Sequence, residues 1–177
     1  SIDYEEKLYA AGRIPGSFLK REGRPTEKAT LTSRMIDRPL RPMFPKDMRN
    51  DCSVVATVMS VDPDCSPEVT AAIGVSAAIA ISDIPWAGPI SSVNVGLVDG
   101  EIVINPNLEQ RAKTDLNLTV SSTADLVAMI EAGGNEIPDD LMFDCIMAGH
   151  EVNKEVVKFI NGIVAEIGKE KFEFQSN

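Results

Sequence analysis

Apolar and polar positions alternate in three runs in the middle of the chain. The apolar positions of these runs are Val93, Val95 and Leu97, then Ile102 and Ile104, then Leu116, Leu118 and Val120. Asp99-Gly100 stands between the first two runs, and this dipeptide is favoured in a type I′ hairpin turn. The pattern therefore predicts antiparallel strands. Residues 126–131 either pair back as a further strand or form a short helix.

Helix-forming and helix-breaking residues predict the elements that precede these strands. A short helix is predicted over residues 28–37, ended by the three prolines that follow it. Residues 52–61 are rich in β-branched and apolar side chains, which predicts a buried strand. Pro67 then opens a helix that runs to about residue 82, and its many small side chains allow it to lie close on a sheet.

A long amphipathic helix is predicted near the end of the chain. Pro138 suits its first position, and Asp139 and Asp140 favour the positive end of its dipole. Lys169 and Lys171 follow at its C-terminal end. Its apolar stripe, with spacings of three and four residues, consists of Leu141, Cys145, Ala148, Val152, Val156, Phe159, Ile163 and Ile167.

The order of these elements predicts the fold class. Loop, helix, strand, helix, three or four antiparallel strands and a final helix indicate an α+β fold, with helices packed on one face of a mostly antiparallel sheet. The length of 177 residues suits one domain. We assign residues 1–50 to a basic loop and short helix of that domain, and residues 51–177 to its core.

The charge is unevenly distributed along the chain. Residues 1–50 hold 11 Lys/Arg and 7 Asp/Glu. Residues 51–177 hold 6 Lys/Arg and 20 Asp/Glu, so the net charge of the whole chain is −10. A basic segment on an acidic body indicates a local site for an anion. Neither a signal peptide nor a membrane-spanning run is visible. No membrane contact is therefore expected. Three cysteines without CxxC spacing favour a reduced, cytoplasmic compartment.

The basic segment is dominated by arginine, whose planar guanidinium matches phosphate oxygens. Its cations are Arg13, Lys20, Arg21, Arg24, Lys28, Arg34, Arg38 and Arg41. On a helix the last three would share one face, where like charges oppose each other by a few tenths of a kcal/mol. Such a face needs acidic neighbours or an anionic ligand. Salt bridges within the segment and a grip on phosphates therefore both remain open.

Phe18 and Asp37 refine these two interpretations. Phe18 lies beside Lys20 and Arg21 in a glycine-bounded loop, where an exposed ring can stack on a single-stranded base. The alternative is that the ring anchors the loop on the body of the protein. Asp37 lies between two of the arginines and is interpreted as orienting them.

Other kinds of site are not expected. His150 is the only histidine and has no ligand-type residue four positions away, so a structural role is predicted. The phosphate-binding pattern GxxxxGK[ST] does not occur. Cys52 and Cys145 fall on apolar faces and are interpreted as small core residues.

Two stretches resemble the polynucleotide phosphorylase family. Residues 11–25 read AGRIPGSFLKREGRP and residues 34–42 read RMIDRPLRP, as in the first RNase PH-like core domain of that family. The resemblance continues to Gly149-His150-Glu151 and covers nearly the whole chain. It implies a fold like ribosomal protein S5 domain 2. It also implies that the opening strands of the domain are missing, so that an exposed edge would cause self-association or a swapped dimer.

The resemblance also implies a function and a division of labour. The family forms homotrimeric rings that degrade RNA from the 3′ end with phosphate, and the sites for phosphate and Mg²⁺ belong to the second core domain. No catalytic residue is therefore expected in this chain, and the chain alone is expected to be inactive. By the same resemblance, the residues that hold the RNA are Phe18, Lys20, Arg21, Arg24, Arg34, Arg38 and Arg41.

One loop departs from the family pattern of two aromatic and two basic residues. Leu19 has no π-face, and Lys20 keeps its charge without a bidentate fork. We expect an RNA-binding core domain of a phosphorolytic 3′→5′ exoribonuclease, with single-stranded RNA as ligand and no DNA. The alternative is a purely structural assembly domain of the ring, its arginines used in salt bridges. A small-molecule kinase is opposed by the missing glycine-rich loop.

Overall fold

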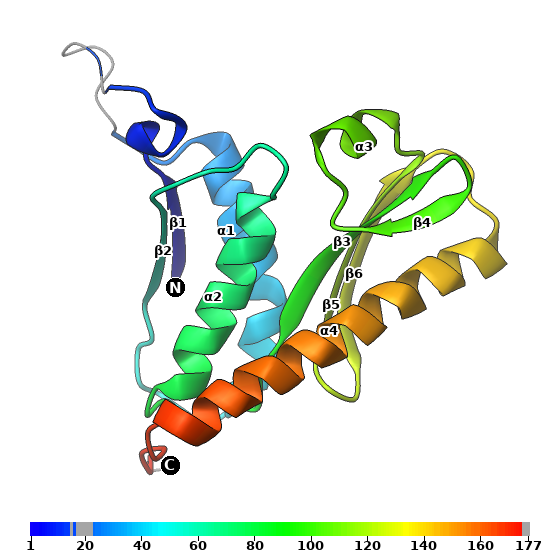
Figure 1. Ribbon diagram of the computed structural model, residues 1–177. Helices are drawn as coiled ribbons and strands as arrows, with labels where there is room; N and C mark the ends of the chain where they lie inside the picture. Colours follow the sequence, from blue (N-terminus) through cyan, green and yellow to red (C-terminus); the bar gives the residue numbers. More distant parts are fainter. Residues whose placement is uncertain (15, 17–22, 175–177) are drawn as a thin grey trace.

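The alternating runs of the sequence form a four-stranded antiparallel sheet (Figure 1). The computed structural model describes residues 1–14, 16 and 23–174. The sheet has the order β4-β3-β5-β6 and consists of β3 (Ser91–Val98), β4 (Glu101–Ile104), β5 (Leu116–Ser122) and β6 (Val127–Gly134). Of the strand and the short helix that were both possible for residues 126–131, the structure shows the strand. Asp99 and Gly100 have φ values of 51° and 78°, the two positive angles of a type I′ turn, which confirms the predicted hairpin.

A second, two-stranded sheet lies beside the helices and was not predicted. Strand β1 (Ile2–Glu6) pairs in parallel with β2 (Val54–Val58), from Ile2 opposite Val54 to Glu6 opposite Val58. The prediction of a buried strand over residues 52–61 was right about the strand and wrong about its burial. Val55 is 59% exposed, because alternate side chains of β2 point away from the helices, and Met59, just after the strand, is 67% exposed.

Helix α1 (Glu27–Leu40) begins at a side-chain cap and ends one turn later than predicted. The Thr26 hydroxyl accepts a hydrogen bond from the backbone N–H of Ala29 at 3.1 Å. Pro39 lies inside the last turn of the helix and does not end it. The chain continues as a 3₁₀ turn (Arg41–Met43), and another 3₁₀ turn (Leu8–Ala11) follows β1.

Helix α2 (Pro67–Ile81) packs with α1 and the parallel sheet around the first hydrophobic core. Its small residues allow this close packing, as predicted. The Ser76 hydroxyl accepts a hydrogen bond from the backbone N–H of Ile90 at 2.9 Å and so joins α2 to the segment that leads into β3. The buried residues of this core are Tyr4, Ala29, Ile36, Leu40, Ala72, Val75, Ile79 and Ile90.

Helix α4 (Asp139–Ile167) crosses one face of the four-stranded sheet and covers the second core (Figure 1). Gly149 permits the close approach, since an added Cβ would lie 3.0–3.2 Å from side-chain atoms of Val95 and Val120. The helix begins at Asp139 with Pro138 as its N-cap, one residue later than predicted. The buried residues of the second core are Val93, Val95, Leu97, Leu116, Leu118, Val120 and Cys145.

The predicted apolar stripe of α4 is correct in its first half and wrong in its second. Cys145 is fully buried, but Phe159 and Ile167 are 70% and 62% exposed. Asn153 is buried instead, and its side-chain amide donates a hydrogen bond to the carbonyl of Val120 at 3.0 Å. The sheet thus selects a different face of the helix from the one that apolar spacing selects. The short helix α3 (Leu108–Lys113) was also not predicted.

The segment that follows α4 returns to the C-terminal end of α2. The ammonium group of Lys171 donates hydrogen bonds to the carbonyls of Ile79, Ala80 and Ser82, and the backbone N–H of Lys169 donates to Ile81. These donors satisfy carbonyls that the end of a helix leaves without partners. Lys171 therefore caps α2 and not its own helix. Among the described helices, none is both long and apolar enough for a bilayer crossing.

Candidate nucleic-acid interface

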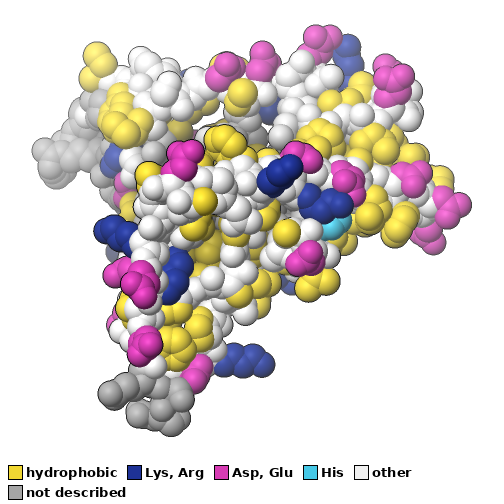
Figure 2. Space-filling view, turned by 60° about the horizontal axis from the view of Figure 1, so that its bottom comes forward, with side chains coloured by type: hydrophobic (Ala, Val, Ile, Leu, Met, Phe, Trp, Pro, Cys, Tyr) yellow, Lys and Arg dark blue, Asp and Glu magenta, His cyan; other side chains and the backbone are white. Residues whose placement is uncertain are grey.

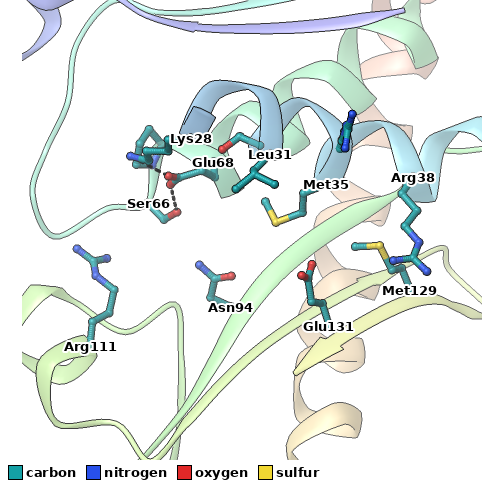
Figure 3. A pocket seen from close by; sticks show the side chains of 13 residues that line it. Lys28, Leu31, Met35, Arg38, Ser66, Glu68, Asn94, Arg111, Met129 and Glu131 are labelled. Carbon is teal, nitrogen blue, oxygen red and sulfur yellow. Dashed lines mark hydrogen bonds and ion pairs between the residues drawn. The ribbon is translucent and has the colours of Figure 1, made fainter. Parts of the chain in front are cut away.

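A cleft of about 670 Å³ opens between α1 and the face of the sheet that α4 does not cover (Figure 3). Helix α1 forms one wall, the sheet forms the other, and the start of α2 closes one end. The lining residues are Lys28, Leu31, Thr32, Arg34, Met35, Arg38, Ser66, Pro67, Glu68, Asn94, Arg111, Met129 and Glu131.

Arg34 and Arg38 project from α1 into this cleft. Four residues apart on a helix, they lie on the same side, and both side chains are exposed. Figure 3 shows Arg38 reaching from α1 toward Met129 on β6. Neither arginine has an ion-pair partner within residues 1–14, 16 and 23–174. Two guanidinium groups are thus available to an anion in the cleft.

Arg41 and Asp37 behave differently from the prediction. Arg41 donates through Nε and Nη2 to the Asp37 carboxylate, and it lines a separate hollow of about 250 Å³. This ion pair raises the pKa of Arg41. The interpretation of Asp37 as orienting the two preceding arginines is therefore wrong, because its carboxylate faces Arg41. The structure brings Arg34 and Arg38 together in the cleft and leaves Arg41 outside it.

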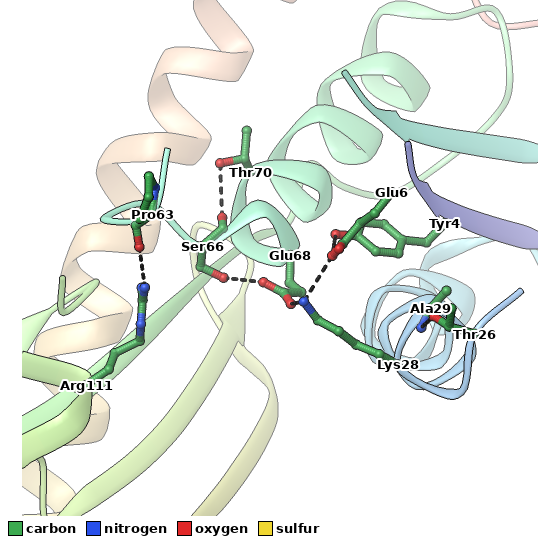
Figure 4. Close-up of polar contacts among 10 residues, drawn as sticks. All are labelled: Tyr4, Glu6, Thr26, Lys28, Ala29, Pro63, Ser66, Glu68, Thr70 and Arg111. Atoms are coloured by element: carbon green, nitrogen blue, oxygen red, sulfur yellow. Dashed lines mark hydrogen bonds and ion pairs between the residues drawn. The ribbon is translucent and has the colours of Figure 1, made fainter. Parts of the chain in front are cut away.

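Lys28 belongs to an ion-pair network at one end of the cleft (Figure 4). Its ammonium group lies 3.1 Å from carboxylate oxygens of both Glu6 and Glu68, and the Glu68 carboxylate also accepts a hydrogen bond from Ser66 at 2.7 Å. Burial opposes ionisation of Glu68, but the Ser66 hydroxyl, the backbone and Lys28 together hold its pKa below the ordinary value. Lys28 is thus occupied by salt bridges within the chain.

Changing Lys28 to Met is expected to raise the pKa of Glu68, because the variant removes a hydrogen bond and a favourable charge. In the native chain, ionised Glu68 contributes stability that is present above its unfolded pKa and is lost as pH falls through the lower folded pKa. Carboxyl NMR titration measures the shift. Changing Lys113, which pairs with Glu109 at 2.9 Å, is the matched control. A Glu68 titration that is identical in native chain and Lys28→Met variant would contradict the network.

Arg111 is a cleft residue that sequence reasoning missed. It lies on the short helix α3, and its guanidinium is held by the carbonyl of Pro106 at 3.1 Å and by that of Pro63. Figure 3 shows it at the same end of the cleft as Lys28 and Ser66. Its isolated position, far from the basic segment along the chain, provided no signal of a role there.

The walls of the cleft also carry apolar and amide groups. Met35 on α1 and Met129 on β6 contribute thioether side chains, and Asn94 on β3 contributes an amide (Figure 3). Glu131 places a carboxylate on the same wall as Met129. The cleft therefore combines exposed cations with thioether and amide groups, while one carboxylate disfavours anions near β6.

Of the other predicted RNA-binding residues, Arg24 is exposed just before α1 and is not among the residues that line the cleft. Arg13, a further cation of the basic segment, is exposed after the first 3₁₀ turn. Phe18, Lys20 and Arg21 lie outside the described residues, so their predicted contacts with RNA stay predictions.

His150 is buried on α4, consistent with the predicted structural role. Cys145 is fully buried, whereas Cys52 is only half-buried. In the part of the chain that the structure describes, no three His, Cys, Asp or Glu side chains gather where they could hold a metal ion. The residues described here thus do not fit a magnesium site.

Comparison with family models identifies two adjoining matches. The model of the 3′ exoribonuclease family, domain 1, matches residues 1–85, and the model of domain 2 of the same family matches residues 88–152. The boundary lies close to the change from the first hydrophobic core to the second. The cleft lies between the two matched parts, since α1 comes from one and the sheet from the other.

Curated relatives with high identity carry one name. The chain is 62% identical over 176 residues to the polyribonucleotide nucleotidyltransferase of Ruminiclostridium cellulolyticum, covering 99% of this chain and 25% of that protein. It is 61% identical over 171 residues to the enzyme of the same name from Clostridioides difficile, covering 97% of this chain and 24% of that protein. The chain thus spans about a quarter of the length of the curated relatives it matches.

A solved structure shares the fold. The crystal structure of rice (Oryza sativa) Rrp46 matches with a TM-score of 0.69 and 14% identity, covering 93% of this chain and 72% of that one. At this identity the likeness concerns the fold alone. Together with the family models, it confirms the predicted α+β, RNase PH-like fold.

Proposed function

The chain belongs to the 3′ exoribonuclease family, and from this membership we propose that it is the RNA-binding core domain of a phosphorolytic 3′→5′ exoribonuclease. Such an enzyme cleaves RNA with phosphate and releases nucleoside diphosphates. The observation that carries the proposal is the pair Arg34 and Arg38, exposed in a cleft and without ion-pair partners in the described chain.

In this proposal the cleft holds a stretch of single-stranded RNA. Arg34 and Arg38 bind neighbouring phosphates, because a guanidinium offers two parallel donors to phosphate oxygens. Arg111 binds a third, and its two carbonyl contacts keep its guanidinium in place. Bases rest against the partly exposed side chain of Met35, and no base-specific contact is required.

The other predicted contacts and partners extend this proposal. Arg24 and the loop with Phe18, Lys20 and Arg21 would guide the RNA, as the family resemblance implies. The reaction itself would take place in a longer, homotrimeric, cytoplasmic enzyme whose phosphate and Mg²⁺ are bound by residues outside this chain. The chain's own part would be to hold and orient the RNA.

A second candidate function is that of an assembly domain whose cations serve salt bridges. It is favoured by the Arg41–Asp37 pair and by the contacts of Lys28 with Glu6 and Glu68. The two candidates differ in what they require of Arg34 and Arg38, since only the first requires an RNA phosphate beside them.

Single-stranded RNA binding tests the proposal directly. With three to five phosphate contacts, the slope of log affinity against log salt should be about −2 to −3.5, because each contact contributes about −0.7. Fluorescence anisotropy of labelled oligo(A), repeated over a salt series, measures this slope. Incubation with oligo(A), phosphate and Mg²⁺ should release no ADP above a no-protein control. Salt-independent binding would reject the phosphate grip, and ADP release would reject the non-catalytic role.

A further inference from the structure

The C-terminal half of α4 presents a surface of exposed apolar and charged side chains that nothing in the described chain covers. A shallow hollow of about 590 Å³ lies along it, lined by Glu155, Lys158, Phe159, Gly162, Ile163 and Glu166. Phe159 is 70% exposed, and Ile167, just beyond the hollow, is 62% exposed. Figure 2, which brings the lower side of Figure 1 forward, shows hydrophobic side chains at the surface among acidic and basic ones.

Gly162 lies at the centre of this surface and leaves room for a close neighbour. An added Cβ at this position would have no atom within 4 Å. Residues 155, 159, 162 and 166 follow at helical spacing, so they form one continuous face. A second helix could approach the backbone of α4 most closely at Gly162, with Phe159 beside the crossing point.

Charged residues are placed evenly on both sides of Gly162. Lys158 and Glu166 stand four residues before and after it. The two residues thus carry opposite charges at equal distances from the glycine. Neither has an ion-pair partner in the chain as far as the structure describes it.

This arrangement is complementary to itself under a two-fold rotation. When two copies of α4 cross antiparallel at Gly162, a residue before the glycine in one copy lies next to the residue equally far after it in the other. Lys158 of each copy then meets Glu166 of the other. A two-fold contact requires such self-complementarity, because the same surface contributes both sides.

We propose that a second copy of this chain docks on this surface, with the two α4 helices antiparallel and crossing at Gly162. Phe159 of each copy packs over the Gly162–Ile163 region of the other, and the charged pairs fix the direction of the helices. Exposed aromatic side chains at the centre of a contact carry much of its energy. This dimer is independent of the RNA cleft, which lies on the opposite face of the sheet.

Sedimentation velocity over a hundredfold range of concentration tests the dimer with the 177-residue chain. The native chain is expected to pass from monomer to dimer, and Phe159→Ala to weaken dimerisation about tenfold, as loss of a central aromatic does. Gly162→Leu should block the crossing without disturbing the fold, since the position is open. Phe143→Ala is the matched control, because Phe143 is also largely exposed on the same helix but lies outside the hollow.

A charge exchange identifies the geometry. Lys158→Glu and Glu166→Lys should each weaken self-association, because each places like charges opposite one another. An equal mixture of the two variants should form a heterodimer as readily as the native chain dimerises. Circular dichroism confirms that each variant is folded. A native chain that stays monomeric, or a dimer that is insensitive to Gly162→Leu and to both charge changes, would overturn the proposal. If the dimer forms but is insensitive to these α4 changes, a Val55→Lys change on β2 shows whether the two chains associate through that strand instead.

Discussion

Replacing Arg34 and Arg38 together with Glu is expected to weaken binding of single-stranded RNA by about a hundredfold or more. Both arginines line the cleft without an ion-pair partner in its described surroundings, so each is free for a phosphate. A hydrogen bond to a charged group contributes about 1.5–3 kcal/mol, so two lost contacts amount to at least about 3 kcal/mol. The salt slope should become shallower by about 1.4, since two contacts at about 0.7 each disappear.

Arg41→Glu provides the matched control for this double change. Arg41 stands on the same segment, but it already pairs with Asp37 and lies outside the cleft. Its reversal should therefore weaken RNA binding far less than the double change and leave most of the salt slope in place. The affinity of all variants is measured by anisotropy at several salt concentrations. If the Arg34/Arg38 variant binds RNA with native affinity and slope, these arginines are structural and the assembly interpretation is favoured.

Replacing Ile36 with Ala is expected to destabilise the fold by about 2–5 kcal/mol. Ile36 is 2% exposed and holds α1 against the first hydrophobic core, so its truncation leaves a cavity. Chemical denaturation followed by circular dichroism measures the loss. Leu31→Ala on the same helix is the control, because Leu31 is 59% exposed and its truncation should change stability by less than about 0.5 kcal/mol. Equal losses in the two variants would contradict the assigned orientation of α1.

The sequence predicted best those elements whose signals are local. The Asp99-Gly100 turn and the alternation around it need only neighbouring residues, and both are found as predicted. Strand β1 was missed because its partner lies about fifty residues away along the chain and its sequence is mostly acidic and polar. The second half of α4 was assigned the wrong face because polar Asn153 is buried against a carbonyl of β5. Apolar spacing contains no information about such a contact.

The candidate site shows the same division between local and distant signals. The spacing of Arg34 and Arg38 correctly placed both on one side of a helix. The partner of Asp37 could not be read from its position, because residues on both sides of it were suitable and only the structure selects Arg41. Arg111 enters the cleft from another element altogether, held by carbonyls 5 and 48 residues away.

The cap that Lys171 places on α2 has a consequence for the order in which the chain can mature during synthesis. The carbonyls it satisfies, in residues 79, 80 and 82, leave the ribosome about ninety residues before their donor. Until that donor is made, the carbonyls of Ala80 and Ser82 lack it, whereas the carbonyl of Ile79 can already accept hydrogen bonds from the backbone N–H and the hydroxyl of Ser82. The first core therefore gains the restraint from Lys171 only after the whole sheet and α4 have been translated.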